Sequence, residues 1–236
     1  GRNYMTCVLF RQSVKFTVVQ FSYLAHTVYM PFTFSHPAAV LPFRKFFSRY
    51  LSFAGLFIGS ITPDFEYFIR MKSKYSHTFD GIFWFDLPMA VLIAFLFFNI
   101  TRNYLIDNLP VFIKSRLVPL RQFNWNRYFA ENWLKVLVSM LIGIMTHVAW
   151  DSFTHRTGWF VQHTAALNGT MELFGTKVPV YRVLQHASTL VGGAAILIFI
   201  YIQPVQGVHK QIRLSYWIIV VLITFIFTMI GFNQAR

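Results

Sequence analysis

The stretch that decides the fold is WLKVLVSMLIGIMTHVAWDSF, which covers residues 133–153. Its length is close to the roughly 20 residues that an apolar helix needs to cross a bilayer. Most of its side chains are apolar, so it predicts a membrane-spanning helix. It also contains His147 and Asp151, and polar side chains inside a span are energetically costly and tend to be functional.

Four further apolar stretches flank it, at residues 51–68, 82–100, 187–202 and 216–232. Pro63 and Asp64 interrupt the first of them, so a re-entrant segment is an alternative to a full crossing there. The sequence therefore predicts an all-α fold, a polytopic transmembrane helical bundle with four or five apolar spans.

The composition of the whole chain agrees with this fold class. Of 236 residues, 56% are hydrophobic and only 12% are charged, whereas a soluble domain typically carries about 25% charged residues. The net charge of +13 comes from 21 Lys and Arg against 8 Asp and Glu. In a membrane protein such cations belong in short loops and at lipid headgroups, so membrane lipid is the expected partner and nucleic acid is not. The single Cys excludes an intrachain disulfide and a Cys-rich metal site.

The first 29 residues differ from the rest. The segment MPFTFSHP, residues 30–37, reads like a natural start, so we predict one helical membrane domain over residues 30–236 and an N-terminal extension over residues 1–29. An interfacial helix, a signal-like segment and extraneous translated sequence are the alternatives for the extension. Further along, residues 101–132 are basic and end in FNWNRYF, a composition that suits an interfacial helix.

The sharpest polar motif is HVAWDSFTH, in which His147, Asp151 and His155 are spaced by four residues. Residues at i, i+4 and i+8 share one face of a helix, so this imidazole and carboxylate can bind one metal ion. Catalytic zinc sites combine such donors with others from elsewhere in the chain. The alternative is a buried hydrogen-bonded pair that only braces the helices.

Two other segments carry candidate ligands. In SITPDFE, Asp64 lies at the break in the first apolar stretch, where it could ligate a metal or cap the next helix. In SHT, His77 precedes the second span and could be a ligand or a solvated loop residue. Asp80 and Asp86 flank it as acceptors for a ring N–H. If the second span crosses and the third returns, Asp64 and His77 reach the same face as His147.

Three further residues complete the candidate site. His36 opens a helix in which Pro follows in the favoured first position, and it could be a ligand or only an N-terminal polar residue. His186 opens the fourth span, on the same side as Asp151 if the third and fourth spans form a hairpin. Arg182 lies one turn earlier. It could hold an anionic substrate group, since Arg pairs bidentately with phosphate, although a headgroup anchor is the more usual role.

Several of these segments together resemble a known family. They are MPFTFSHPAAVLP, IGSITPDFEYF, YSHTFDGIFWFDLP, IDNLP, FNWNRYF, THVAWDSFTH and VPVYRVLQHASTL. In this order and spacing they closely resemble the bacterial membrane-protein family catalogued as domain of unknown function 4184. The resemblance runs from Met30 to about Gly193. It implies a protein of the bacterial cytoplasmic (inner) membrane and names no activity.

A second, more distant resemblance bears on function. The chain is similar in pattern to inner-membrane metal-dependent hydrolases, which are akin to zinc-dependent phospholipases C and P1-type nucleases. The shared pattern is an early His, a Pro-Asp, a Ser-His and an HxxxD. The resemblance implies one set of metal ligands, formed by His36, Asp64, His77, His147 and Asp151. The soluble relatives hold three zinc ions with more histidine ligands than this chain clearly offers.

The leading hypothesis is a membrane-embedded hydrolase that depends on a divalent metal, expected to be zinc, and that acts on a lipid phosphoester or ester. His155 and His186 are the catalytic candidates, which would orient ligands, carry a proton or bind a second ion. Arg182 is the substrate-binding candidate. Two alternatives stay open: a transporter or proton relay, because intramembrane His and Asp chains also conduct protons, and a structural or assembly protein.

Overall fold

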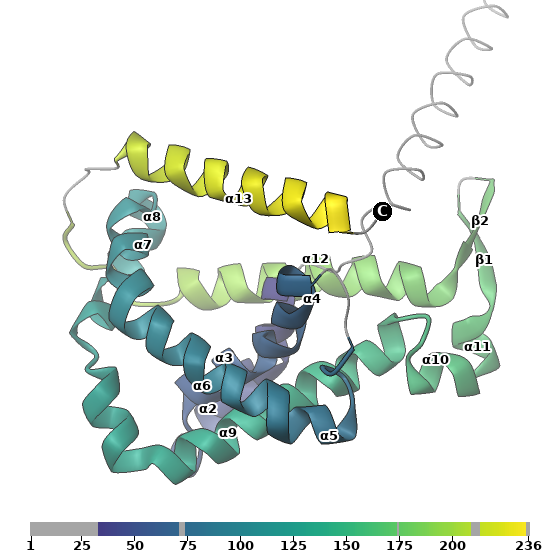
Figure 1. Ribbon diagram of the computed structural model, residues 1–236, viewed down its shortest axis with the longest axis horizontal. Helices are drawn as coiled ribbons and strands as arrows, with labels where there is room; N and C mark the ends of the chain where they lie inside the picture. Colours follow the sequence, from purple (N-terminus) through teal and green to yellow (C-terminus); the bar gives the residue numbers. More distant parts are fainter. Residues whose placement is uncertain (1–32, 71–73, 174, 209–212, 235–236) are drawn as a thin grey trace, which may run out of the picture. The chain divides into compact units, whose positions relative to one another are not determined.

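The computed structural model describes residues 33–70, 74–173, 175–208 and 213–234, and the extension predicted over residues 1–29 lies outside them. In the described part the chain is mostly helical, and its two short strands form one hairpin (Figure 1).

The helices and strands follow one another in three groups. The first group is η1 (Thr33–Val40), α2 (Leu41–Phe46), α3 (Phe53–Ile61), η2 (Thr62–Asp64) and α4 (Phe65–Arg70). The second is α5 (Phe79–Gly81), η3 (Ile82–Asp86), α6 (Leu87–Leu96), η4 (Phe97–Thr101), α7 (Arg102–Asn108), α8 (Val111–Leu117) and η5 (Val118–Gln122). The third is α9 (Trp125–Thr154), α10 (Trp159–His163), α11 (Ala165–Asn168), β1 (Thr170–Leu173), β2 (Thr176–Pro179), α12 (Val180–Tyr201) and α13 (Leu214–Gln234).

Three helical stretches are long and apolar enough to cross a membrane. They are Phe79–Asn108, Trp125–His163 and Val180–Tyr201. They contain or overlap the spans predicted at residues 82–100, 133–153 and 187–202, so those three helices are confirmed. The described apolar part of α13, Leu214–Ile226, is shorter.

The stretch predicted as the first span is divided into short helices. Within residues 51–68, α3 ends at Ile61, a 3₁₀ turn carries Pro63, and α4 begins at Phe65. Proline has no N–H for the helical ladder and clashes with the preceding turn, which explains the break. This break places Asp64 at the junction of two helices rather than inside one.

Among the described elements, α3 packs most extensively against α9 (Figure 1). Gly59 of α3 lies against the backbone of Met140, and Gly143 of α9 lies against the backbone of Leu56. Only glycine allows two helix backbones to approach so closely. The start of α3 is also fixed, because the Ser52 amide donates to Ser139 Oγ at 2.7 Å. These contacts hold the last turn of α3 beside the second half of α9.

The apolar core lies between α3, the second helical group and α9. Its buried members are Ile58, Ile61, Ile82, Ala90, Ala94, Phe98, Trp125, Val136, Met140 and Ile144. The aromatic segment FNWNRYF leads into the start of α9, where the non-helical residue Asn132 (φ −133°, ψ 23°) kinks the chain and separates residues 125–131 from the rest of the helix. The Trp125 ring is buried and stacked on Phe98, with ring centroids 4.7 Å apart. An interfacial position for this short helical piece stays a prediction.

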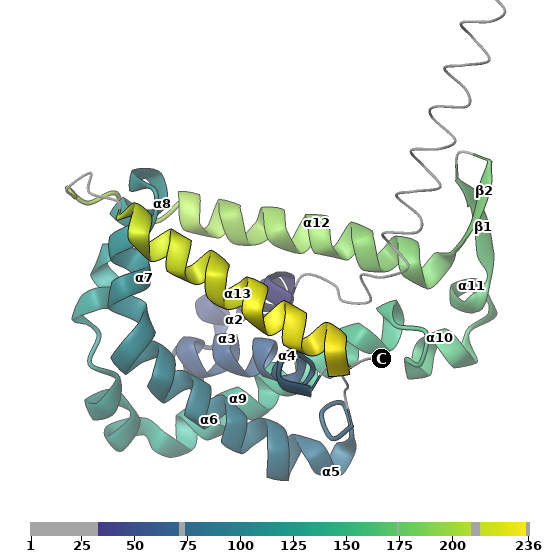
Figure 2. The same cartoon turned by 45° about the horizontal axis from the view of Figure 1, so that its top comes forward.

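The remaining elements frame this core. β1 and β2 pair antiparallel, with Thr170 opposite Pro179, and connect α11 to α12 (Figure 2). In turn, α12 packs on η1 and on α9. Many large apolar side chains on α12 and α13 are exposed, such as Leu190 and Ile223. Contiguous exposed apolar surface of this kind marks contact with lipid or a partner rather than with water.

Candidate metal centre

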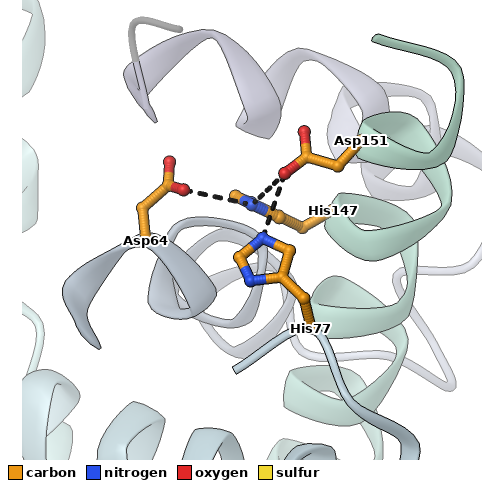
Figure 3. A group of neighbouring side chains, drawn as sticks. All are labelled: Asp64, His77, His147 and Asp151. Atoms are coloured by element: carbon orange, nitrogen blue, oxygen red, sulfur yellow. Dashed lines mark hydrogen bonds and ion pairs between the residues drawn. The ribbon is translucent and has the colours of Figure 1, made fainter. Parts of the chain in front are cut away.

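Four polar side chains from three segments converge beside the α3–α9 contact (Figure 3). His147 and Asp151 lie one turn apart on α9, Asp64 ends η2, and His77 lies in the loop before α5. Each offers one ligand atom, and these atoms all lie within 4.8 Å of one another. The structure therefore brings together four of the five residues implied as one ligand set, and the group could hold a metal ion.

The separations between these atoms are short. His147 Nε2 lies 3.5 Å from Asp64 Oδ1 and 3.3 Å from Asp151 Oδ2. His77 Nε2 lies 3.0 Å from the same Asp151 oxygen. The side chains of His147, Asp64 and Asp151 are buried, whereas His77 is partly exposed.

The hydrogen bond made by Nδ1 of His147 identifies which ring nitrogen carries the proton. Nδ1 lies 2.7 Å from the carbonyl oxygen of Ser60. A carbonyl can only accept, so Nδ1 carries the proton and donates it. In the neutral ring Nε2 then presents a lone pair to the carboxylates of Asp64 and Asp151. A ligating histidine whose other N–H binds a backbone carbonyl has this same arrangement.

The proton on His77 is placed in the same way. Its Nδ1 lies 3.1 Å from Ser76 Oγ, and that hydroxyl donates its single proton to Glu66 Oε2 at 2.8 Å. Ser76 Oγ therefore accepts from His77 Nδ1, and the lone pair of Nε2 faces Asp151. Ser76, rather than the flanking Asp80 or Asp86, is thus the partner of the ring N–H.

Glu66 holds the loop that carries His77. Its Oε2 accepts from the backbone amides of Lys74, Tyr75 and Ser76 at 3.0, 2.9 and 2.7 Å, in addition to the Ser76 hydroxyl. Burial alone would raise the pKa of Glu66, but these hydrogen bonds outweigh it and lower the pKa. His77 itself has φ 69°, a left-handed conformation that non-glycine residues rarely adopt and that often marks functional sites.

If both rings are neutral, the lone pairs of the two Nε2 atoms face carboxylate oxygens. Such an arrangement repels unless a positive species lies between the groups, because each of these atoms is an acceptor. The positive species is either a metal ion or a proton added to the rings. The group could therefore hold a metal ion, and ion pairs between protonated rings and the carboxylates are the alternative.

Replacing Glu66 by Gln tests the loop contact. The Gln side-chain amide has one acceptor oxygen and no negative charge, so it cannot accept the four hydrogen bonds as well as the Glu66 carboxylate does. We expect the affinity for divalent metal to fall by about 10- to 100-fold, as for other residues that orient ligands. Competition with a chelator of known affinity measures it, and Glu172→Gln on the exposed strand β1 is the control. Equal affinities in the two variants would contradict the assignment.

His36 and His155 lie next to the same aspartate. His36 Nε2 is 3.6 Å and His155 Nδ1 is 3.3 Å from Asp151 Oδ1. The His36 ring also stacks on that of His147, with centroids 3.8 Å apart. Burial is the largest cause that lowers the pKa of His36 to about 4, so the ring is neutral at neutral pH and can act as a ligand.

The candidates on α12 are not joined to this group. Within the described residues, His186 and Arg182 make no hydrogen bond or ion pair with it; His186 is exposed and Arg182 is half-buried. The residue of α12 that does contact the group is Gln185, whose Nε2 lies 3.4 Å from His155 Nε2. Asp86 is fully buried, and neither of its oxygens has a hydrogen-bond partner in the part of the chain described.

Sequence reasoning did not find Glu66, Ser76, the Ser60 carbonyl or Gln185. Glu66 lies two residues after Asp64, so the two do not share a helical face and the spacing does not place Glu66 beside Asp64. The available signal was an acidic residue inside an otherwise apolar stretch, which needs a partner when it is buried. That partner is the backbone of a loop about ten residues further along, which no local spacing reveals.

The fold and site define a helical protein with three apolar helices long enough to cross a membrane and a buried His/Asp group that could hold a metal ion. The chain belongs to the family described as Domain of unknown function (DUF4184), whose family model matches residues 30–236. The family resemblance is thus confirmed, and the match extends past Gly193. A search of curated proteins and a search of solved structures each found no match.

Proposed function

We propose that this protein is a membrane-embedded hydrolase that depends on a divalent metal, with zinc as the expected ion. The observation that carries the proposal is the convergence of the Nε2 atoms of His77 and His147 with carboxylate oxygens of Asp64 and Asp151 in one group. In this proposal Asp64, His77, His147 and Asp151 ligate the ion, and His36 belongs to the same centre.

The residues fit zinc in kind, and the two contacts of His147 Nε2 also fit it in spacing. Zinc binds histidine nitrogen and carboxylate oxygen at about 2.0–2.2 Å, in a tetrahedral arrangement. Two ligand atoms of such a tetrahedron are about 3.3–3.6 Å apart at those bond lengths. The separations of 3.3 and 3.5 Å around His147 Nε2 match this, and the 3.0 Å between His77 and Asp151 is slightly shorter.

A bound divalent ion would polarise an ester or phosphoryl oxygen and acidify water. The surrounding residues would supply the rest of the chemistry. His155 is partly exposed beside Asp151, so it is positioned to move a proton between the site and the outside. His186 and Arg182 on α12 would act on substrate at the periphery, with the Arg182 guanidinium binding an anionic group.

The substrate class follows from the membrane setting. A lipid phosphoester or ester would reach such a site directly from the bilayer, and the exposed apolar side chains of α12 and α13 support contact with lipid. In this proposal α13 is a fourth span, residues 51–68 form a re-entrant segment, and the protein lies in a bacterial cytoplasmic membrane. The polar break at Pro63 and Asp64 supports re-entry.

The rival function is proton relay without hydrolysis. The same contacts around Asp151 allow it, because protonated rings would satisfy the carboxylates as well as a metal does. A structural role is the third alternative. Bound zinc that is lost in His147→Ala supports the hydrolase. A zinc-free protein with proton flux in liposomes supports the relay, and neither signal, with a lower melting temperature in the variant, supports a structural role.

Metal removal tests the proposal directly. Purified protein in mild detergent, treated with a chelator, is expected to lose hydrolysis of a lipid phosphoester or ester panel by at least about 100-fold, since a metal supplies several kcal/mol of transition-state stabilisation. Added zinc should restore the rate. Hydrolysis that survives both the chelator and His147→Ala would refute the metal-dependent mechanism.

A further inference from the structure

We propose that the centre holds two divalent cations and that Asp151 bridges them, with the second cation bound by His36 and His155. This inference rests on the proposed metal-binding function and deepens it, because a two-metal centre selects a phosphoester substrate.

The two oxygens of Asp151 face different histidines. Oδ2 lies 3.0 Å from His77 Nε2 and 3.3 Å from His147 Nε2. Oδ1 lies 3.6 Å from His36 Nε2 and 3.3 Å from His155 Nδ1. Each oxygen thus has its own pair of imidazole nitrogens at separations close to those of ligands on one ion. A carboxylate placed in this way can bridge two cations, with one cation at each oxygen.

The stacked rings of His36 and His147 argue against a single ion. Their centroids are 3.8 Å apart and their planes differ by 26°. A metal binds an imidazole in the ring plane, along the nitrogen lone pair, so two nearly parallel rings direct their lone pairs at two separate points. Two-metal sites have their ions about 3.5–4 Å apart, which matches the stacking distance. His36 therefore serves a different ion from His147.

His36 also needs a partner that the described residues do not provide. Its side chain is 1% exposed, and neither ring nitrogen has a hydrogen bond within the described part of the chain. A buried polar group without a hydrogen-bond partner destabilises the folded state. The helix that carries it, η1, packs on α3, α9 and α12, so the ring is held there by three neighbours. A cation at Nε2 would satisfy it.

His155 completes the set of ligands for the second cation and leaves that cation accessible. Its Nε2 lies 3.4 Å from the Gln185 amide. Nδ1 also lies 3.3 Å from Thr154 Oγ1, and that hydroxyl lies 3.3 Å from the Trp150 carbonyl oxygen, to which it can donate instead. For Nδ1 to ligate a metal, the Gln185 amide must turn so that its oxygen accepts from Nε2–H. His155 is 28% exposed, unlike His36. Three protein ligands with one open side are the pattern of a catalytic ion.

A bridged pair of ions implies a substrate class. Two cations about 4 Å apart stabilise both the attacking and the leaving oxygen of an in-line displacement at phosphorus. A phosphodiester offers two non-bridging oxygens that carry negative charge, one for each ion, whereas a carboxylic ester offers one uncharged carbonyl oxygen. The inference therefore selects a phosphoester of a membrane lipid over a simple lipid ester, with water as co-substrate: water oxygen bonds to phosphorus, the ester P–O bond breaks, and the leaving oxygen takes up a proton.

Metal stoichiometry and paramagnetic resonance test the second position. The full chain in detergent, made metal-free and titrated with Mn²⁺, is expected to bind two ions, with a spectrum of two magnetically coupled ions. His155→Ala should bind one ion and show an uncoupled spectrum. His36→Gln is the second variant. His163→Ala on α10 is the control, which should still bind two ions. Circular dichroism confirms that each variant is folded.

The outcomes separate this inference from the proposed function. One ion in the wild type, lost in His147→Ala but kept in both His155→Ala and His36→Gln, overturns the second position and leaves the proposed function standing. Two ions without magnetic coupling overturn the bridging role of Asp151. A wild type that binds no ion overturns both. Two coupled ions, with one remaining in the His155 variant, support the inference.

Discussion

Asp151→Asn is expected to abolish metal binding more completely than any other single substitution. Its carboxylate lies within 3.6 Å of nitrogen atoms of four histidines, so every ion at the centre depends on it. We expect bound zinc to fall to less than about a tenth of the wild-type amount and phosphoester hydrolysis to fall by about 100- to 1,000-fold. Elemental analysis of purified protein and a steady-state assay measure the two effects.

Asp80→Asn is the matched control for this substitution. It makes the same chemical change on an exposed aspartate near the His77 loop, outside the metal group. It should leave metal content and rate as in the wild type. If Asp151→Asn kept its metal while Asp80→Asn lost it, the ligand assignment would be wrong.

Gly143→Val is expected to cause the largest loss of stability. A Cβ at this position would meet the carbonyl of Leu56 and the amide of Ser60, both of which are backbone atoms that cannot rotate away. The α3 and α9 helices would have to separate, and overpacking of this kind costs about 1–3 kcal/mol or more. For a chain of this size we expect a melting temperature lower by about 5–10 °C.

The same substitution should weaken metal binding. Separation of α3 from α9 moves the Ser60 carbonyl away from His147 Nδ1, which removes the contact that orients the ring. Gly193→Val on α12 is the control, because a Cβ there meets nothing within 4 Å. A melting temperature for Gly143→Val equal to that of Gly193→Val would show that the helix contact is looser than described.

The helices were predictable from the sequence where apolar runs are long and uninterrupted. The spans at residues 82–100, 133–153 and 187–202 are of this kind, because a bilayer demands a nearly constant length of apolar helix. The segment FNWNRYF leads into the short helical piece before the kink at Asn132. Its aromatic composition suits both a membrane interface and a buried position, and the burial of Trp125 on Phe98 depends on packing with a separate helix, which the local sequence does not reveal.

The site was predictable where its residues share a helix or frame a conspicuous break. The i, i+4 spacing of His147 and Asp151 survives in the structure because both lie on α9. The approach of Asp64 and His77 to them required the assumption that helices return to one face. The position of His36 beside Asp151 depends on how η1 packs, which no local pattern encodes. For the same reason sequence reasoning chose His186, whereas Gln185, one residue earlier on α12, is the neighbour of His155.

The hydrogen bond between Ser60 and His147 joins residues 87 positions apart. A ribosome-bound chain that stops before α9 lacks His147 and Asp151, and so has no way to retain an ion at Asp64 and His77. In the proposed function, metal would therefore be loaded late, after α9 has docked on α3. The proposed hydrolase would thus remain inactive throughout its own biogenesis, and neighbouring lipids would be safe from hydrolysis until assembly is complete.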